Sequence, residues 1–500
     1  MSNYFYNLLK IFMINKISNT GFNFDNSYIE LPPEFYSPAN LQPVKSPQLV
    51  ILNNELSNSL GLNTDFLKSP EGIYIMSGNI KIPDGAYISQ AYAGHQFGGF
   101  TMLGDGRALL IGEQITPSNQ RFDIQLKGSG RTPYSRNGDG RAVLGPMLRE
   151  YIISEAMHGL NIPTTRSLSV ISTGENVYRE TIQQGAILTR VASSHIRFGT
   201  FEYAAYMLDY EKLKKLSDYT IKRHFPFLEN NENKYINLLD EVIKLQASLV
   251  AKWQSVGFIH GVLNTDNMSI CGETIDYGPC AFMDVYNPDT VFSSIDTNGR
   301  YAYKNQIAIV NWNLYRLAET LLPLINSDEN KAIELAQNSL SKFINLATSN
   351  LSHEMCSKIG IFEPKTSDID LLNELLNMMQ KYKEDYTNTF IALTFNDLPQ
   401  KGMFISEEFI NWKKKWEETL TLQNKSKDEV FDLMKNSNPA VIPRNHRVEE
   451  ALSAANNRDF SVMNNLLKAL SNPFEHSEFQ KEYAKLPSTP QCNYRTYCGT

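Results

Sequence analysis

The pattern of apolar and polar residues predicts a strand-like part that precedes a mostly helical part. Residues 121–127 alternate strictly: Phe122, Ile124 and Leu126 fall on one face and polar residues on the other. This alternation predicts a half-buried strand with Lys127 on its polar face. Later segments carry apolar residues at helical spacing. We expect helices over 146–158, which ends at Gly159, over 238–256, which ends at Gly257, and over 311–325, 331–347 and 369–382.

This order of elements predicts an α+β fold with two lobes and a nucleotide cleft between them. Proline and asparagine interrupt the apolar runs of residues 1–80, so an irregular N-terminal extension is expected there. Residues 81–235, which contain several glycine-rich segments, are expected to form the N-lobe. Residues 236–480 are expected to form a helical C-lobe, followed by a tail over 481–500.

Composition and charge narrow the classes of function. The chain has 500 residues and a formal net charge of -7, which argues against nucleic acid as a partner. Five cysteines at uneven spacing predict neither a disulfide framework nor a zinc site. The apolar stretch over 4–14 is too short and too interrupted to insert into a membrane. A cytoplasmic protein is expected; the first 24 residues lack acids, as a mitochondrial transit peptide would, but they also lack arginine.

Two successive loops carry the residue types of a magnesium–ATP site. Asn267 and Asp276 supply an amide and a carboxylate oxygen, which are ligands that Mg²⁺ accepts together with phosphate oxygens. The interval from His260 to Asn267 equals that of the protein-kinase catalytic loop, and Asp276 opens an Asp-Tyr-Gly step like the kinase Asp-Phe-Gly. The alternative is that residues 264–267 form an ordinary turn, because Asn, Thr and Asp favour turns.

One position departs from the kinase pattern. Where a kinase has its catalytic aspartate, two residues after the histidine, this chain has Val262, which cannot accept a proton. Asp266 is the nearest acid that could deprotonate a hydroxyl. Ordinary phosphotransfer by the usual base is therefore in doubt.

Lys127 at the end of the predicted strand is a candidate phosphate ligand. In kinases the equivalent lysine pairs with a helix glutamate. Glu150 and Glu155 both lie on the expected helix, and periodicity does not choose between them. The glycine-rich segment around Gly104 and Gly106 matches neither a Walker nor a dinucleotide motif, and a plain hairpin would explain it as well. Six arginines near these turns could bind polyphosphate: Arg107, Arg131, Arg136, Arg141, Arg190 and Arg197.

Several longer segments together resemble the selenoprotein O family, which comprises protein adenylyltransferases with a pseudokinase fold. They are residues 92–98 (YAGHQFG), 103–107 (LGDGR), 125–136 (QLKGSGRTPYSR), 139–141 (DGR), 260–267 (HGVLNTDN) and 276–279 (DYGP). The resemblance runs from about residue 30 to the C-terminus. It implies a protein-kinase-like two-lobed fold in which ATP binds flipped, so that AMP is transferred to a protein Ser, Thr or Tyr hydroxyl and pyrophosphate leaves.

The resemblance also implies roles for individual residues. Asp266 would be the catalytic acid or base, and Asn267 and Asp276 would hold Mg²⁺, or Mn²⁺ in its place. Lys127 would bind phosphate and pair with Glu150. The other nucleotide contacts would come from Gly104, Gly106, Arg107, Asp139, Gly140, Arg190, Arg197 and Asp276.

The resemblance extends to partners and to the tail. Redox proteins are the suggested targets, and the enzyme could also modify itself. Cys498 stands where the family often has a selenocysteine or cysteine, although the following Gly-Thr departs from the usual Ser-Ser. A disulfide from Cys498 to Cys492 or Cys280 is a hypothesis; the alternative is a thiol on a frayed tail.

Three classes of function remain open at this point: an adenylyltransferase, a kinase-like phosphotransferase in which Asp266 replaces the missing base, and a non-catalytic nucleotide-binding pseudokinase. Val262 is the best argument for the third class. The presence of Lys127, Asn267 and Asp276 speaks against it, because a degraded site is expected to lose its metal ligands.

Overall fold

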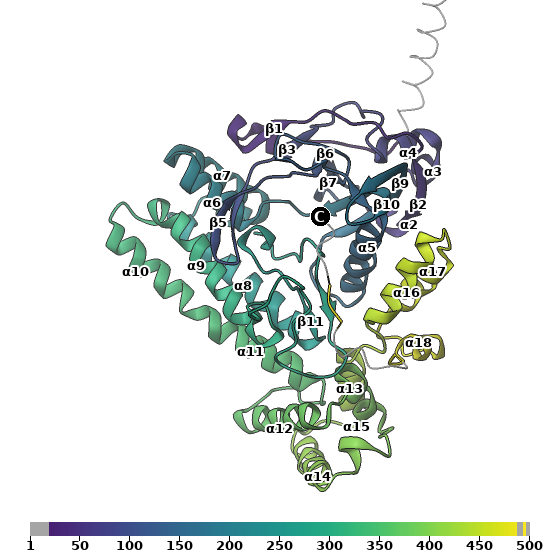
Figure 1. Cartoon of the computed structure of the whole chain (residues 1–500). Coiled ribbons are helices and arrows are strands. Elements are labelled where there is room, and N and C mark those ends of the chain that lie inside the picture. The colour runs from purple at the N-terminus through teal and green to yellow at the C-terminus, as the bar shows by residue number, and fades with distance from the viewer. Residues whose placement is uncertain (1–19, 488–493, 497–500) are drawn as a thin grey trace, which may run out of the picture.

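The computed structural model describes residues 20–487 and 494–496. It has the expected α+β class, with a sheet lobe followed by a helical lobe (Figure 1). The strands are β1 (Tyr36–Pro38), β2 (Gln48–Leu52), β3 (Ile88–Gln90), β4 (Ala93–Gln96), β5 (Gly99–Met102), β6 (Ala108–Ile115), β7 (Arg121–Lys127), β8 (Ala142–Val143), β9 (Arg166–Tyr178), β10 (Ile182–Ala192), β11 (Phe258–Ile259) and β12 (Ala281–Phe282).

The helices lie mostly after the strands. They are α2 (Asn54–Ser59), α3 (Thr64–Lys68), α4 (Pro70–Met76), α5 (Leu144–Gly159), α6 (Phe198–Met207), α7 (Tyr210–His224), α8 (Lys234–Ser255), α9 (Gln306–Ile325), α10 (Glu329–Leu340), α11 (Lys342–Ser357), α12 (Thr366–Tyr382), α13 (Tyr386–Phe395), α14 (Glu407–Thr421), α15 (Lys427–Ser437), α16 (Asn445–Asn456), α17 (Ser461–Leu470) and α18 (Glu478–Tyr483). Among the described residues, no helix is long and apolar enough to cross a membrane.

The large sheet is antiparallel, with strand order β1-β3-β6-β7-β10-β9-β2, and β8 pairs with β10. One face packs against α2–α4 in a core that includes Leu67, Ile124 and Leu168. The other face packs against α5, whose Leu148 and Ile152 also belong to the core of the helical lobe. Helix α5 is therefore shared by both lobes, and α16 and α17 lie along it (Figure 1).

The irregular extension expected over residues 1–80 is wrong for the part of it that the structure describes. Residues 20–80 contribute β1 and β2 to the sheet and form α2–α4. The asparagines that suggested breaks are N-caps: the side chains of Asn53 and Asn63 accept hydrogen bonds from the backbone N–H groups of Leu56 and Phe66. Pro70 occupies the first position of α4, where a proline is tolerated.

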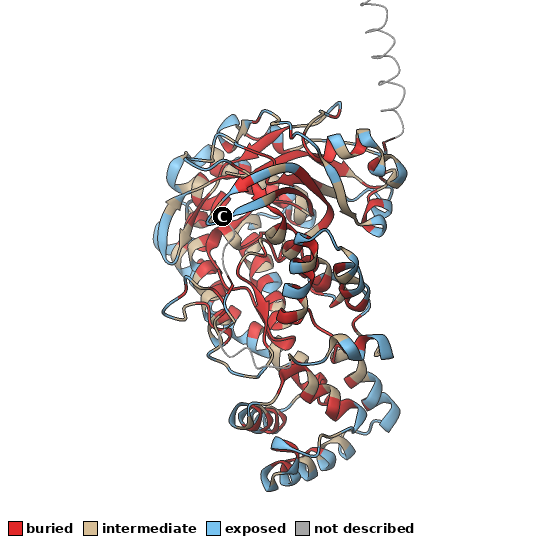
Figure 2. Cartoon of the chain, turned by 45° about the vertical axis from the view of Figure 1, so that its right-hand side comes forward, coloured by how far each residue is buried: buried red, intermediate tan, exposed pale blue. Residues whose placement is uncertain are grey.

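Strand β7 has the predicted bounds, but its polar face is not solvated. Asp123, Gln125 and Lys127 are all buried, as Figure 2 indicates for the centre of this sheet. Each side chain has a buried partner of opposite or complementary character. Asp123 contacts Arg223 and His195. These partners make the burial tolerable, because burying such groups without them would be costly.

Candidate active site

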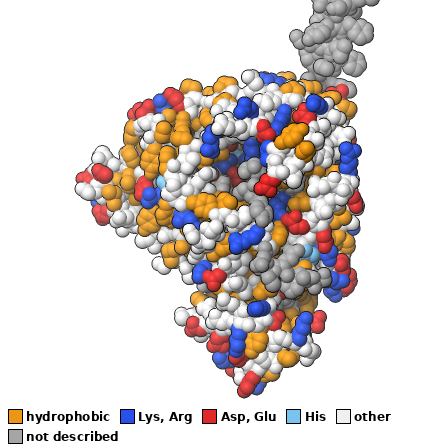
Figure 3. Space-filling view, viewed as in Figure 1, with side chains coloured by type: hydrophobic (Ala, Val, Ile, Leu, Met, Phe, Trp, Pro, Cys, Tyr) orange, Lys and Arg blue, Asp and Glu red, His pale blue; other side chains and the backbone are white. Residues whose placement is uncertain are grey.

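A cavity of about 870 Å³ lies between the sheet, α5 and the loops that follow β11 and precede β12. Basic side chains surround a hollow near the centre of the face in Figure 3. Nine of the site residues expected from the sequence line this cavity: Gly106, Arg107, Lys127, Glu150, Arg190, Arg197, Asp266, Asn267 and Asp276. The segments that carry them are far apart in the chain, so the fold brings them together.

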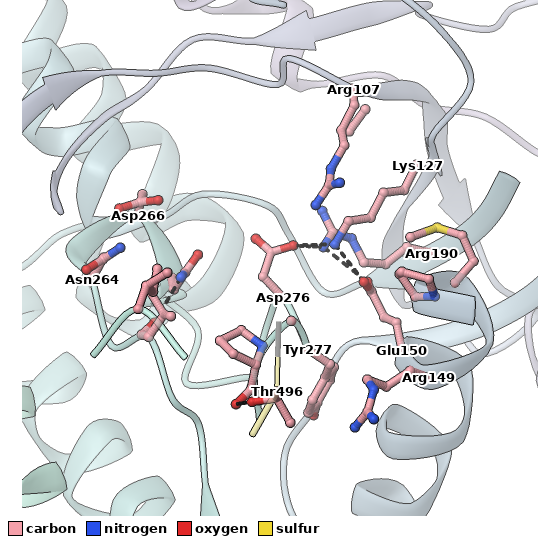
Figure 4. A pocket seen from close by; sticks show the side chains of 18 of the residues that line it. Arg107, Lys127, Arg149, Glu150, Arg190, Asn264, Asp266, Asp276, Tyr277 and Thr496 are labelled. Atoms are coloured by element: carbon pink, nitrogen blue, oxygen red, sulfur yellow. Dashed lines mark hydrogen bonds and ion pairs between the residues drawn. The ribbon is translucent and has the colours of Figure 1, made fainter. Parts of the chain in front are cut away.

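Asp276 is the centre of a cluster of cations. Its Oδ1 lies 2.7 Å from Lys127 Nζ and 2.6 Å from an Arg190 nitrogen, and its Oδ2 lies 2.7 Å from an Arg197 nitrogen. Figure 4 shows this carboxylate pointing toward Lys127, with Asp266 on the opposite side of the view. Burial alone would raise the pKa of Asp276, but the three positive charges hold it well below its ordinary value. The carboxylate is therefore ionised, and a polyphosphate could compete for its cations.

Each cation is positioned by a different element. Lys127 ends β7, Arg190 lies on β10, the next strand of the sheet, and Arg197 precedes the first residue of α6. The guanidinium of Arg190 also donates to Gln125 Oε1 at 2.6 Å, and that of Arg197 stacks over the Tyr92 ring at 4.5 Å. These contacts fix the guanidinium groups in the cavity wall.

The partner of Lys127 on α5 is Glu150. The Lys127 Nζ to Glu150 Oε2 distance is 2.6 Å, and both side chains are buried. Glu155 is turned away and binds Arg166 at 2.6 Å and Asn53 at 2.7 Å. The choice that periodicity left open is thus made by the tertiary structure, and it has the form of the strand-lysine to helix-glutamate pair of protein kinases.

Asp266 lies in the same cavity, apart from the cation cluster. Burial raises the pKa of its carboxyl to about 6, although the charge of Arg197 opposes this. Its Oδ2 accepts a hydrogen bond from Gln96 at 3.3 Å, whereas its Oδ1 is buried without a partner among the described residues. A buried carboxylate with an unused oxygen is a chemically suitable proton acceptor.

The loop between β11 and Asn267 is held from several sides. The amide nitrogen of Asn267 donates to the carbonyl of Val262 at 2.9 Å, so its side-chain oxygen remains available to the cavity. Buried His260 bonds the carbonyl of Ile275 at 3.0 Å, which ties this loop to the one that carries Asp276. His260 therefore braces the two loops against each other.

Asn267 and Asp276 fit a divalent cation that also binds phosphate. They present one amide oxygen and one carboxylate to the same cavity. Within residues 20–487 and 494–496, no group of three or more His, Cys, Asp or Glu side chains could hold a metal. A cation bound between Asn267 and Asp276 would therefore need phosphate oxygens and water to complete its coordination.

Three expected nucleotide contacts lie outside the cavity wall. Asp139 pairs with Arg179 at 2.9 Å, and the carbonyl of Gly140 accepts from the backbone N–H of Gly130 at 3.1 Å. Gly104 adopts φ +103° and packs against Tyr134, where a Cβ would lie 2.5 Å from the ring. The plain hairpin considered for this turn is also wrong, because β5 pairs with β4 and β6 pairs with β3 and β7. A nucleotide contact from these three residues stays a prediction.

Several residues of the site were not predicted from the sequence. Asp105 is buried, accepts hydrogen bonds from Gln125 and the Gln90 backbone, and lies 3.9 Å from Arg197. In the sequence, its place between Gly104 and Gly106 indicates a turn and gives no sign of these buried contacts. Asn264 belongs to the loop motif, but its role in joining loops becomes apparent only in the structure.

The tail contributes to the cavity wall as well. Thr496 donates from its backbone N–H to Phe292 at 2.8 Å and from its hydroxyl to Pro279 at 2.7 Å, beside the Asp-Tyr-Gly step. Tyr494 and Arg495 also line the cavity. Cys492 and Cys498 lie outside the described residues, and Cys280 is buried, so the disulfide hypothesis stays a prediction.

Comparison with known proteins agrees with this geometry. The sequence profile of the family described as "Protein adenylyltransferase SelO" matches residues 19–471. Proteins named "Protein nucleotidyltransferase YdiU" are similar over nearly the whole chain. The one from Bacillus cytotoxicus is 62% identical over 487 residues, which are 97% of this chain and 99% of the relative. The one from Clostridium beijerinckii is 60% identical over 484 residues, with the same coverage.

Among solved structures, ROP2 from Toxoplasma gondii, described as a virulence factor with a protein-kinase fold and no enzymatic activity, aligns with a TM-score of 0.23 and 8% identity. That alignment covers 67% of this chain and 88% of ROP2. The family assignment rests on the full-length sequence matches. The chain therefore belongs to the protein adenylyltransferase SelO family and is an enzyme of the nucleotidyltransferase class.

Proposed function

We propose that the enzyme transfers AMP from ATP to Ser, Thr or Tyr hydroxyls of proteins and depends on Mg²⁺, with Mn²⁺ as a possible substitute. The observation that carries this proposal is the pairing, in one cavity, of a three-cation cluster with a separate buried carboxylate that has an unused oxygen. The cations suit a polyphosphate, and the carboxylate suits a hydroxyl proton.

In this proposal the triphosphate displaces Asp276 as the main partner of Lys127, Arg190 and Arg197. Arg107, on the same side of the view as Lys127 and Arg190, adds a further guanidinium (Figure 4). A divalent cation held by Asn267 and Asp276 would neutralise phosphate charge and orient the triphosphate. Glu150 keeps Lys127 in place when Asp276 turns to its new partners.

Asp266 acts on the acceptor. Its Oδ1 takes the proton of the substrate hydroxyl while the hydroxyl oxygen forms a bond to the α-phosphorus of ATP. The bond between the α-phosphorus and the bridging oxygen to the β-phosphate breaks, and pyrophosphate leaves with the electron pair. The product is a protein-O-AMP ester.

A phosphotransferase is the main alternative, and one experiment separates the two. The protein is incubated with MgCl₂, casein and ATP labelled on the α- or the γ-phosphate. Label on protein from the α position alone supports AMP transfer, and label from the γ position alone supports a kinase. Retained ATP binding with no label from either position would support a non-catalytic nucleotide-binding protein and overturn the proposal.

The role of Asp266 has its own test. Asp266→Asn removes the proton acceptor with little change in shape, so we expect α-label transfer to fall at least 100-fold while ATP binding stays within about threefold. ATP binding can be followed by isothermal titration. Transfer by Asp266→Asn at the wild-type rate would contradict the assigned role. Redox proteins as targets, and self-modification, remain expectations from the family resemblance.

A further inference from the structure

A second cavity of about 540 Å³ opens beside the first and shares two lining residues with it, Phe97 and Ile295. Phe97 is at the tip of the β4–β5 hairpin, and Ile295 lies in the loop between β12 and α9. Both side chains are exposed, by 41% and 55% respectively. The two cavities therefore meet at an apolar boundary that is open to solvent.

The boundary is rigidly joined to the loop that carries the catalytic carboxylate. The side-chain oxygen of Asn264 accepts from the backbone N–H of Phe97 at 3.1 Å and from the hydroxyl of Tyr301 at 2.6 Å. The Phe97 and Tyr301 rings are 5.1 Å apart. Gln96, the neighbour of Phe97, donates to Asp266. The second cavity thus begins at the Asp266 end of the nucleotide cavity.

This position matches the path that a protein substrate must take. The cation cluster defines the triphosphate end of the first cavity, so the acceptor hydroxyl has to enter at the Asp266 end. A hydroxyl on a polypeptide brings neighbouring residues with it in both directions along the chain. Neighbours on the side of the second cavity would lie against Phe97 and Ile295, which line both cavities.

The charge of the second cavity comes from Arg300. Its guanidinium stacks on Trp312 at 4.9 Å, and it forms no ion pair within the described part of the chain. The neighbouring cations are neutralised: Lys304 pairs with Asp289 at 2.5 Å, and Arg316, on the same Trp312, pairs with Glu319 at 2.7 Å. Buried Asp296 also lines the cavity, but its carboxylate already accepts from the backbone N–H groups of Arg300 and Tyr301.

We propose that the second cavity is a recognition subsite for the acceptor polypeptide, in which Arg300 binds an Asp or Glu side chain close to the hydroxyl that receives AMP. The proposal rests on the proposed AMP transfer to proteins and adds which acceptor sequences the enzyme prefers: those with an acidic residue near the hydroxyl. Among the described arginines and lysines of this loop and of α9, Arg300 alone has no charged partner, so a substrate carboxylate would form its ion pair. Phe97 and Ile295 would pack against the methylene groups of that acidic side chain.

The test uses a peptide array. Each peptide carries one Ser, Thr or Tyr, and each flanking position in turn is Asp, Glu, Ala, Lys or Arg. The full chain is supplied with Mg²⁺ and α-labelled ATP. We expect acidic residues at one or two flanking positions to raise labelling about tenfold over alanine, and basic residues there to lower it.

Matched variants assign the preference to Arg300. Arg300→Gln should abolish the acidic preference and leave ATP binding unchanged, whereas Lys304→Gln, in the same loop but outside the cavity, should keep it. Because Arg300 also packs on Trp312, its substitution could disturb folding. A second pair of variants therefore tests the subsite without changing Arg300. Ile295→Glu places a negative charge in the subsite and should weaken labelling of acidic peptides about tenfold. Ile405 is 59% exposed and lines neither cavity, so Ile405→Glu should leave this labelling unchanged.

The outcomes separate the two proposals. If the wild type labels peptides without an acidic preference, or if Arg300→Gln and Ile295→Glu both keep the preference, the subsite is overturned and AMP transfer stands. If the wild type labels no peptide and no protein from α-labelled ATP, the proposed function fails, and the subsite fails with it.

Discussion

The pKa values of two carboxyl groups ten positions apart in the chain, Asp266 and Asp276, are shifted in opposite directions because their neighbours differ. Asp276 is surrounded by Lys127, Arg190 and Arg197, which lower its pKa, whereas burial dominates at Asp266 and raises its pKa to about 6. Environments that separate the pKa values of paired acids are typical of catalytic sites. The environment of Asp266 also affects the stability of the folded protein.

The raised pKa of Asp266 predicts a pH-dependent cost to folding. In the unfolded chain this carboxyl ionises near its ordinary pKa of 3.8, but in the folded protein it keeps its proton up to about pH 6. The folded state therefore loses stability as the pH rises between these values, and the cost persists above pH 6. Asp266→Asn removes this cost. We therefore expect the difference in free energy of unfolding between the variant and the wild type to shift in favour of the variant by on the order of 2–3 kcal/mol from pH 4 to pH 7.5. Urea unfolding of both proteins at the two pH values measures this gain, and an equal stability difference at both would refute it.

Gly94 packs directly against Asp266, the proposed proton acceptor. A Cβ at this position would lie 2.6 Å from Oδ1 of Asp266, so Gly94→Ala must displace the carboxylate. We expect AMP transfer to fall at least tenfold while ATP binding stays within about twofold. Gly99→Ala in the same hairpin is the control, because its Cβ would meet only the Gln96 carbonyl at 3.6 Å. Equal activities of the two variants would show that Asp266 tolerates displacement.

At the scale of single elements, the two glutamates of α5 have separate functions. Glu150 positions Lys127 in the cavity, and Glu155 joins α5 to β9 through Arg166. We expect Glu150→Gln to lower kcat/KM for AMP transfer tenfold or more with a small change in Tm. Glu155→Gln should lower Tm with kcat/KM nearly unchanged, because its contacts lie outside the cavity. Steady-state kinetics and calorimetry on both variants decide this, and the reverse result would reassign the pair.

Elements with strong local signals were predictable from the sequence. The bounds of β7 and the end of α8 at Gly257, which has φ +73°, follow from alternation and from a glycine stop. The helix expected over 331–347 is interrupted: α10 ends at Leu340 and α11 begins at Lys342, and the hydroxyl of Ser341 donates to the Asn338 carbonyl. A serine that bonds the preceding turn is a weak signal in a single sequence.

The predictable part of the site is the part with motif spacing. Asn267, Asp276 and Lys127 could be expected to lie in one cavity, because kinase-like sites place these residue types at fixed intervals. The choice of Glu150 depends on the packing of α5 under the sheet, and the burial of the polar face of β7 depends on partners such as Arg223, 100 residues away in sequence. Contacts of that range leave no local pattern.

At the scale of the whole molecule, Arg444 links three segments that are far apart in the chain. It precedes α16 and contacts the residue before α13 and the loop after β12. Its guanidinium is fully buried and binds Asp284 at 2.7 Å and Asp385 at 2.6 Å. Arg444→Met leaves two carboxylates without their cation, so we expect a loss of about 3–5 kcal/mol in the free energy of unfolding. Chemical denaturation measures it. Arg447→Met, at a partly buried position of α16 whose partners Glu450 and Glu482 are exposed, should cost under about 1 kcal/mol, and equal losses would contradict the role of Arg444.

The docking of Thr496 beside Pro279 also has a consequence for the timing of biosynthesis. The loop that carries Asp276 and Pro279 is synthesised about 220 residues before Thr496, an interval on the order of 10 to 40 s during translation. This part of the cavity wall is therefore complete only after Thr496 has been synthesised. The wall of one cavity thus joins two segments that are made far apart in time.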